Sequence, residues 1–185
     1  YYKTASNAGQ LSDVFESIQH SETTSGTSVT LTSDSVLRDI ISDKFELPDG
    51  AEASVVSVYT ADSKSVSSDG KNITWDTEEK DTSNKYPVSI NGNKVDVTGF
   101  DYSQNFVTAS HKGKKLIVEI IVNGLQSGID MDSNDTEQVK SGIYKNSTET
   151  TAVKNFTSPK VTIPEYSYVL DYGKKVTIPN TDQSQ

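Results

Sequence analysis

The fold class is decided by one stretch of the chain, Lys115-Leu116-Ile117-Val118-Glu119-Ile120-Ile121-Val122. Every second residue from Leu116 to Val122 is apolar, so these side chains share one face of a β-strand. Ile117 and Ile121 add apolar side chains on the opposite face. The stretch therefore predicts a central strand that is covered on both sides.

A second stretch, residues 87–98, predicts a β-hairpin. Asn91-Gly92-Asn93 has the composition of a tight turn, and Val95 and Val97 alternate with polar residues directly after it. Further strands are predicted where apolar residues alternate or cluster between turns: Ala53 to Tyr59, Val161 to Ile163, Tyr166 to Tyr172 and Val176 to Ile178. Short strands separated by turns rich in Gly, Asn, Asp and Pro indicate a mainly β fold, a two-sheet sandwich.

One short amphipathic helix is predicted near the start of the chain, at residues 7–19. Its apolar residues fall at positions i, i+3, i+4 and i+7: Leu11, Val14, Phe15 and Ile18. The polar residues 20–26 after it have the character of a linker. The segment from Ser35 to Ile41 fits a helix and a strand equally well, and both alternatives stand.

The composition limits the partners of the chain. Its 185 residues carry a formal net charge of -9 and no Cys, and 32% of them are hydrophobic. A surface that repels phosphate groups argues against nucleic acids and anionic membranes as partners. No apolar run has the length of a membrane span. We expect a chain without membrane insertion, part of a longer protein and monomeric by itself.

Several stretches resemble a known family of surface proteins. Tyr1-Tyr2-Lys3-Thr4-Ala5-Ser6 and the apolar stripe over residues 11–18 resemble the final strand edge and last helix of von Willebrand factor A domains. Three later stretches resemble the immunoglobulin-like (Ig-like) region behind such domains: VLRDIISDKFELP at 36–48, GFDYSQNFV at 99–107 and GKKLIVE at 113–119. That arrangement is found in large wall-anchored surface proteins of Firmicutes and related Gram-positive bacteria.

The resemblance implies a domain organisation. Residues 1–20 would be the C-terminal end, including the last helix, of a von Willebrand factor A-like domain. Residues 27–165 would form the Ig-like β-sandwich. Residues 166–185 would be a terminal strand or the start of a following module.

The resemblance also implies a role in cell adhesion. The chain would be a stalk or spacer module of an extracellular, cell-wall-anchored adhesin or pilin-like protein, and it would hold a binding head away from the cell wall. The full-length protein would bind a ligand on a host or neighbouring cell. The Asp-x-Ser-x-Ser metal motif of the A domain does not occur in this sequence. Adhesive activity is therefore not assigned to these residues. Because the acidic residues are scattered over predicted loops and neither His lies near a nucleophile motif, we predict no enzyme, no cofactor and no catalytic or metal-binding residue; the alternative is a carbohydrate- or protein-binding β-sandwich module.

The acidic segment Asp130–Glu137 is the candidate metal site. Asp130, Asp132 and Asn134 match the alternating oxygen ligands that open a calcium loop. However, Asp135 stands where such a loop requires Gly, and the twelfth position is not the Glu that would close it. The segment is therefore predicted to be a solvated acidic loop.

Two further hypotheses concern single residues. Domains that resemble this one often carry a Lys-to-Asn intramolecular isopeptide bond beside a buried acid. Asn155 and Asp39 are candidates for the Asn and the acid, with the lysine left open between Lys44, Lys115 and an upstream segment. For the binding alternative, a sugar could stack on an aromatic platform formed by the only Trp and several Tyr: Trp75, Tyr59, Tyr86, Tyr102 and Tyr144.

Overall fold

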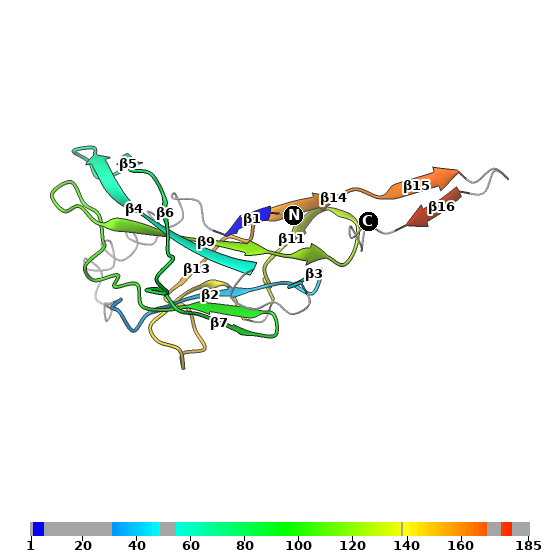
Figure 1. Ribbon diagram of the computed structural model, residues 1–185, viewed down its shortest axis with the longest axis horizontal. Coiled ribbons are helices and arrows are strands. Elements are labelled where there is room, and N and C mark those ends of the chain that lie inside the picture. Colours follow the sequence, from blue (N-terminus) through cyan, green and yellow to red (C-terminus); the bar gives the residue numbers. More distant parts are fainter. Residues whose placement is uncertain (1, 6–30, 49–54, 138, 170–174, 179–185) are drawn as a thin grey trace.

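The protein is described by a computed structural model that covers residues 2–5, 31–48, 55–137, 139–169 and 175–178. Throughout these residues the chain is mainly β, as predicted (Figure 1). The helix predicted at residues 7–19 lies outside them. Within the same residues there is no helix long and apolar enough to cross a membrane.

The first of two antiparallel sheets is built on the stretch that opened the sequence analysis. Its strand order is β1-β9-β4-β5, with β6 also pairing with β4. The bounds are β1 Tyr2–Ala5, β4 Val56–Val66, β5 Ile73–Trp75, β6 Glu79–Lys80 and β9 Lys114–Ile121. The β4–β9 ladder is the longest of the fold, from Val56 opposite Ile120 to Asp62 opposite Lys114.

The second sheet has the order β13-β12-β2-β8-β7. Its strands are β2 Val36–Ile40, β7 Val88–Asn91, β8 Lys94–Val97, β12 Gly142–Tyr144 and β13 Lys154–Asn155. The hairpin predicted at residues 87–98 is confirmed as β7 and β8. They pair through Asn91 and Lys94, so Gly92 and Asn93 form a two-residue turn. Gly92 has a φ of 60°, which glycine adopts without steric cost.

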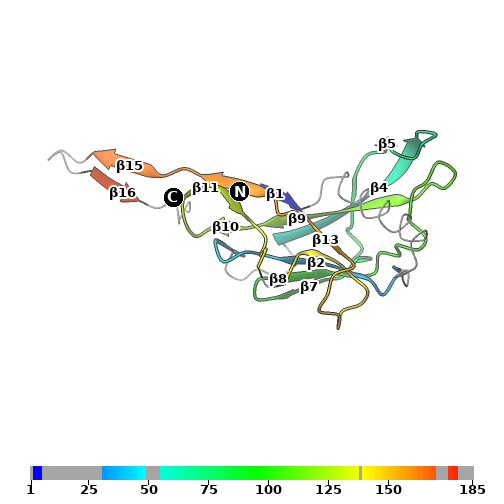
Figure 2. The ribbon, with the colours of Figure 1, turned by 180° about the vertical axis from the view of Figure 1, so that it is seen from behind.

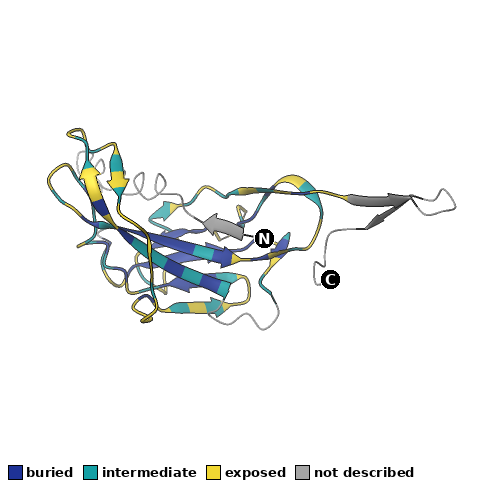
Figure 3. Cartoon of the chain, turned by 45° about the horizontal axis from the view of Figure 1, so that its top comes forward, coloured by how far each residue is buried: buried dark blue, intermediate teal, exposed yellow. Residues whose placement is uncertain are grey.

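The two sheets pack face to face around one hydrophobic core. Figure 3 shows the buried residues concentrated between the two layers. Leu116 and Val118 contribute to this core from the first sheet, and Leu37, Val97 and Ile143 contribute from the second. Burial of each such side chain favours folding by about 1.5–3 kcal/mol, so this shared interior holds the sheets together.

The prediction for β9 is correct except at its end. The strand is central, since β1 and β4 pair with its two edges. Ile117 is buried on the outer face as expected, whereas Ile121 remains 38% exposed. Ile121 is the last residue of the strand, where its cover ends.

The segment that fitted both helix and strand is the strand β2. All five of its residues are buried, because β2 lies between β8 and β12 and side chains cover both faces of the sheet there. A strand buried on both faces has a continuous apolar run, which cannot be distinguished from a buried helix by periodicity.

The stretch GFDYSQNFV at 99–107, part of the family resemblance, contains no strand. It is a connection that contributes two aromatic side chains to the core. The ring of Phe100 packs edge-on against Tyr102 at a centroid distance of 4.9 Å and tilted against Tyr86 at 5.8 Å.

Three small strand pairs complete the fold. They are β3 Phe45–Glu46 with β10 Asn123–Gly124, β11 Gly128–Asp132 with β14 Lys160–Ile163, and β15 Tyr166–Val169 with β16 Lys175–Ile178. The predicted strands around residues 53–59, 161–163, 166–172 and 176–178 correspond to β4, β14, β15 and β16, with shifted ends. Seen from both sides, β14 and β15 leave the sandwich along the long axis of the molecule (Figures 1 and 2).

The two ends of the described chain pair differently: the N-terminal strand joins the first sheet, and the last two strands form a pair of their own. Residues 2–5, assigned by resemblance to a preceding domain, pair with β9 from Tyr2 opposite Ile121 to Ala5 opposite Val118. At the other end, β15 and β16 pair only with each other among the described strands. The domain boundaries themselves remain a prediction.

Candidate functional site

The polar interior of the protein is organised around two consecutive residues of β2. Leu37 and Ile41 belong to the core between the sheets. Asp39 lies between them on the same face of the strand and is 4% exposed. Arg38 points to the opposite face of the sheet and is 5% exposed. Each of these buried charged groups has its own hydrogen-bond network.

The Arg38 network is a closed ionic cluster. Arg38 lies directly opposite Asp96 of β8. Its Nε donates to Asp96 Oδ1 at 2.7 Å and its Nη2 to Asp96 Oδ2 at 2.9 Å. The guanidinium carbon lies 4.5 Å from the ring centroid of Tyr144, on β12. Hydrogen bonding to Asp96 raises the pKa of Arg38 above its ordinary value, and burial raises the pKa of Tyr144.

The same guanidinium fastens a connection to the sheet. Arg38 Nη1 donates to the Glu149 carbonyl and Nη2 to the Ser147 carbonyl, both at 3.0 Å. These carbonyls belong to the connection between β12 and β13. Arg38 thus joins β2, β8 and this connection in one buried cluster.

In the Asp39 network, Oδ1 of the carboxyl group has two neutral hydrogen-bond donors. Asp39 Oδ1 accepts hydrogen bonds from the Asn134 side-chain amide and from the Ser141 hydroxyl, the latter at 2.6 Å. Ser141 Oγ in turn accepts the backbone N–H of Ile40 at 2.8 Å, and Ser133 Oγ donates to Asn134 Oδ1 at 2.8 Å. The buried carboxylate thus holds together β2 and the segment that precedes β12.

Backbone contacts anchor the same segment. Ser42 N–H donates to the Ser133 carbonyl at 2.9 Å, and Asp135 N–H donates to the Ile40 carbonyl at 2.8 Å. Ser42 Oγ donates to the Asp132 carbonyl at 2.7 Å. The connection between β11 and β12 therefore follows the end of β2.

Beside the Asp39 network lies a cavity of about 430 Å³. It opens between the β11–β12 connection and the segment leading from β13 to β14. Its lining residues have polar side chains, with one aromatic exception, although much of the surface they expose is apolar: Asp132, Asn134, Asp135, Thr136, Lys140, Ser141, Asn155, Phe156, Thr157, Ser158 and Lys160. Ligand pockets of proteins begin at about 300 Å³, so the cavity has room for a small molecule.

The formal charges in the cavity wall cancel, since two Asp oppose two Lys. Lys160 Nζ lies 2.7 Å from Asp132 Oδ1. This hydrogen bond lowers the pKa of Asp132, with smaller contributions from Ser158 and Lys44.

The calcium-loop hypothesis placed three oxygen ligands together at Asp130, Asp132 and Asn134. The structure directs them to different places: Asp130 is exposed at a backbone irregularity, Asp132 pairs with Lys160, and Asn134 is buried against Asp39. In the described part of the chain no three His, Cys, Asp or Glu side chains gather into a metal site.

The isopeptide hypothesis was right that Asp39 is a buried acid. Its other members lie elsewhere. Asn155 is exposed on β13 and lines the cavity. Lys115 Nζ lies on the first sheet, 2.8 Å from Glu78 Oε1. The amide that contacts Asp39 is that of Asn134, which the hypothesis did not include.

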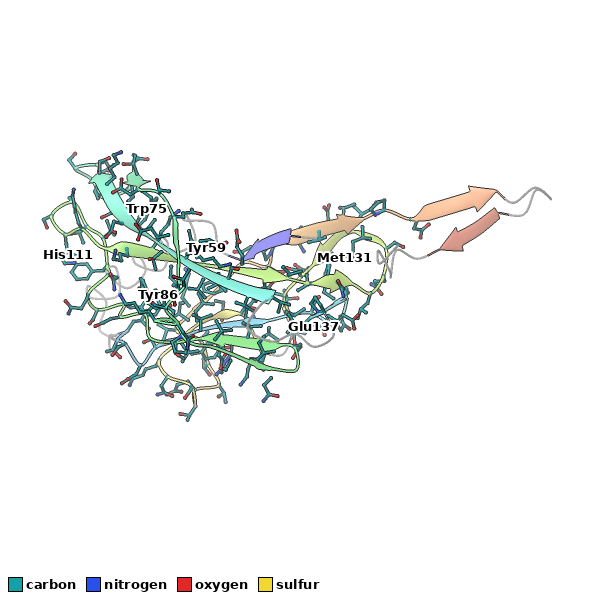
Figure 4. All side chains as sticks on the ribbon, in the orientation of Figure 1. Tyr59, Trp75, Tyr86, His111, Met131 and Glu137 are labelled. Atoms are coloured by element: carbon teal, nitrogen blue, oxygen red, sulfur yellow. The ribbon has the colours of Figure 1, made fainter. Side chains whose placement is uncertain are left out.

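The aromatic platform does not form as proposed. Tyr86, Tyr102 and Tyr144 are buried, at most 6% exposed. Trp75 is half-buried on β5, with Lys115 Nζ at 5.7 Å from its ring. In Figure 4, Trp75 lies at the end formed by β4 and β5, and Tyr86 lies apart from it in the body of the sandwich.

Sequence reasoning missed the Arg38–Asp96 pair and the cavity. One signal was present in the run Val36-Leu37-Arg38-Asp39-Ile40-Ile41, because two charged residues inside a buried strand require partners. The partners, 58 and 95 residues away, follow from strand register and connection geometry.

Comparison with known proteins adds no relative to this description. No family model, no curated protein and no solved structure matches the chain.

Proposed function

We propose that the chain is a structural spacer module of a bacterial cell-surface adhesin or pilin-like protein. In this role an Ig-like sandwich holds a binding head away from the cell wall and catalyses no reaction. The single observation that supports it best is that three of the described connections between strands are held to the sheets by hydrogen bonds of buried polar side chains. The resemblance of residues 36–48, 99–107 and 113–119 to stalk regions adds the location, extracellular and wall-anchored.

Three connections show the fastening. Arg38 holds the one between β12 and β13, and Asp39 and Ser42 hold the one between β11 and β12. The connection before β9 is held to β4 by Gly113 N–H, which donates to Ser63 Oγ at 3.1 Å, and it is braced internally by the Asn105 side-chain amide, which donates to the Asp101 carbonyl at 2.7 Å. Proteases cut segments that open locally. A spacer outside the cell therefore benefits from connections that open only with the whole fold.

The strand directions also suit a spacer. β4 and β9 run along the long axis of the molecule (Figure 1). Hydrogen bonds of an antiparallel ladder are perpendicular to its strands. A load along the long axis is therefore shared by the whole ladder instead of opening it bond by bond.

Single-molecule pulling tests the proposal. The chain is placed between two identical handle domains of known unfolding force and stretched from its termini. We expect one cooperative event that releases the chain from β1 to β14, on the order of 550 Å at about 3.4 Å per residue.

Arg38→Met should lower the unfolding force, and the exposed control Asn72→Ala should leave it unchanged. Unravelling in several small steps, at forces below those of the handles, would contradict a load-bearing role.

A further inference from the structure

The cavity beside Asp39 has the features of a built site rather than of a surface hollow. Its floor is fixed, because Asn134 and Ser141 are at most 5% exposed and are held by Asp39. Ser158 Oγ accepts the backbone N–H of Asn134 at 3.1 Å and closes the other side. The floor atoms therefore keep their positions whether or not a ligand is present, which lowers the entropic cost of binding.

The rim, in contrast, carries unused hydrogen-bonding groups. Thr136, Lys140 and Asn155 are exposed, line the cavity, and make no side-chain hydrogen bond or ion pair with any described residue. An amide, a hydroxyl and an ammonium at the mouth of one cavity can donate and accept several hydrogen bonds at once. Phe156, half-buried in the wall, adds an apolar surface.

The charges decide which class of ligand fits. A metal cation requires several converging ligands, and no three His, Cys, Asp or Glu side chains gather among the described residues; the two Asp of the cavity wall are balanced by its two Lys. An anion would approach a chain of net charge -9 against its field. A neutral ligand rich in hydroxyl groups meets neither obstacle, and its hydroxyls complement both the donors and the acceptors of the wall.

We propose that this cavity binds a neutral saccharide unit. Asn155 and Thr136 would bind its hydroxyl groups at the rim, and Phe156 would contact an apolar patch of C–H groups. This site lies on the second sheet and its connections, apart from Trp75. It goes beyond the spacer function, because a module can bear load with or without a sugar bound.

Two-dimensional amide NMR of the full chain tests the site. The probes are glucose, galactose, mannose and N-acetylglucosamine, each added up to 50 mM as a chosen experimental range. We expect at least one of them to shift the amide signals of residues 132–141 and 155–160 saturably, with a Kd on the order of millimolar, typical of a small ligand with few contacts.

Variants and a charged probe complete the test. Asn155→Ala removes an exposed side chain that makes no hydrogen bond with any described residue, and should weaken binding at least fivefold. The matched control Asn72→Ala, on the β4–β5 connection, should leave the Kd unchanged. Glucuronate should bind more weakly than glucose.

Three results would overturn the site: no saturable shifts with any probe, shifts confined to the surroundings of Trp75, or a Kd that Asn155→Ala leaves within twofold. Tighter binding of glucuronate would overturn the preference for a neutral ligand. None of these results would change the pulling behaviour on which the spacer function is judged.

Discussion

Arg38 and Asp39 are neighbours in the chain, and they carry the two opposite sides of the second sheet. Arg38 is satisfied by the buried Asp96 carboxylate, the buried Tyr144 ring and two carbonyls of the β12–β13 connection. Asp39 Oδ1 accepts hydrogen bonds from two neutral side chains, Asn134 and Ser141, which also line the cavity. The difference teaches that a closed ionic cluster serves stability alone, whereas a neutral cluster beside open space can also present a binding surface.

Removing one partner of the closed cluster should have the largest effect. Arg38→Met leaves Asp96 buried, and among the described residues its remaining ion-pair partner is the half-exposed Lys94, with Nζ at 3.7 Å from Oδ2. Loss of one partner of a buried ion pair costs about 3–5 kcal/mol of folding free energy. Urea unfolding measures it.

The double variant Arg38→Met/Asp96→Leu should recover much of that loss, because it removes the uncompensated charge as well. A loss below about 1 kcal/mol in the single variant would mean that the cluster does not hold the fold, against the usual cost of such a change.

A substitution in the Asp39 network should lower the folding stability less than Arg38→Met does. Ser141→Ala removes a donor from Asp39 and an acceptor from the Ile40 N–H. Unsatisfied buried groups cost about 1–3 kcal/mol, so the variant should fall between wild type and Arg38→Met in urea unfolding. A loss of folding stability equal to that of Arg38→Met would contradict the expectation that the Asp39 network contributes less than the Arg38 network.

The ion pair at the edge of the cavity should contribute a small, pH-dependent term. Because Lys160 lowers the pKa of Asp132 in the folded state, its contribution is present above the unfolded pKa of about 3.9 and is lost as the pH falls through the folded pKa. Partly exposed pairs contribute about 1 kcal/mol or less.

Urea unfolding of wild type and Asp132→Asn between pH 7 and pH 2.5 measures this term. The stability difference should shrink toward zero at the acidic end. A difference that stays constant over this range would contradict the role given to the ionised carboxylate.

The smallest effect is expected for a polar group that belongs to neither network. Tyr102 is 2% exposed, and its hydroxyl has no hydrogen-bond partner among the described residues. Burial accordingly raises its pKa. Tyr102→Phe removes an unsatisfied hydroxyl, so thermal unfolding should show an unchanged or slightly higher Tm. A clear decrease would reveal a partner for the hydroxyl.

The elements that could be predicted from sequence are those with local signals. The alternation of apolar residues predicts β9, and the Asn-Gly turn predicts the β7–β8 hairpin, each from a few neighbouring residues. The sequence could not decide between helix and strand for β2, because a strand buried on both faces shows no alternation of apolar and polar residues. What decides it is its position between β8 and β12, which is a property of the whole fold.

The candidate site could not be predicted for a similar reason. Asp39 is a candidate buried acid in the isopeptide hypothesis, whereas its partner Asn134 falls in a segment predicted to be a solvated loop. The acidic composition of residues 130–137 gives no sign that one amide among them is buried. The cavity arises where the connection after β11 meets the segment after β13. Neither segment carries a motif that reveals the other.

The central claim is that both sheets and their fastened connections form one cooperative unit. The only Trp of the chain, Trp75, reports on the first sheet, whereas Arg38 lies in the second. The most direct measurement is urea unfolding followed in parallel by Trp fluorescence and far-ultraviolet circular dichroism, for wild type and Arg38→Met. We predict coincident transitions in each protein, both shifted to lower urea by the same amount in the variant. A Trp75 transition that does not move with Arg38→Met, or that separates from the circular dichroism transition, would contradict the claim.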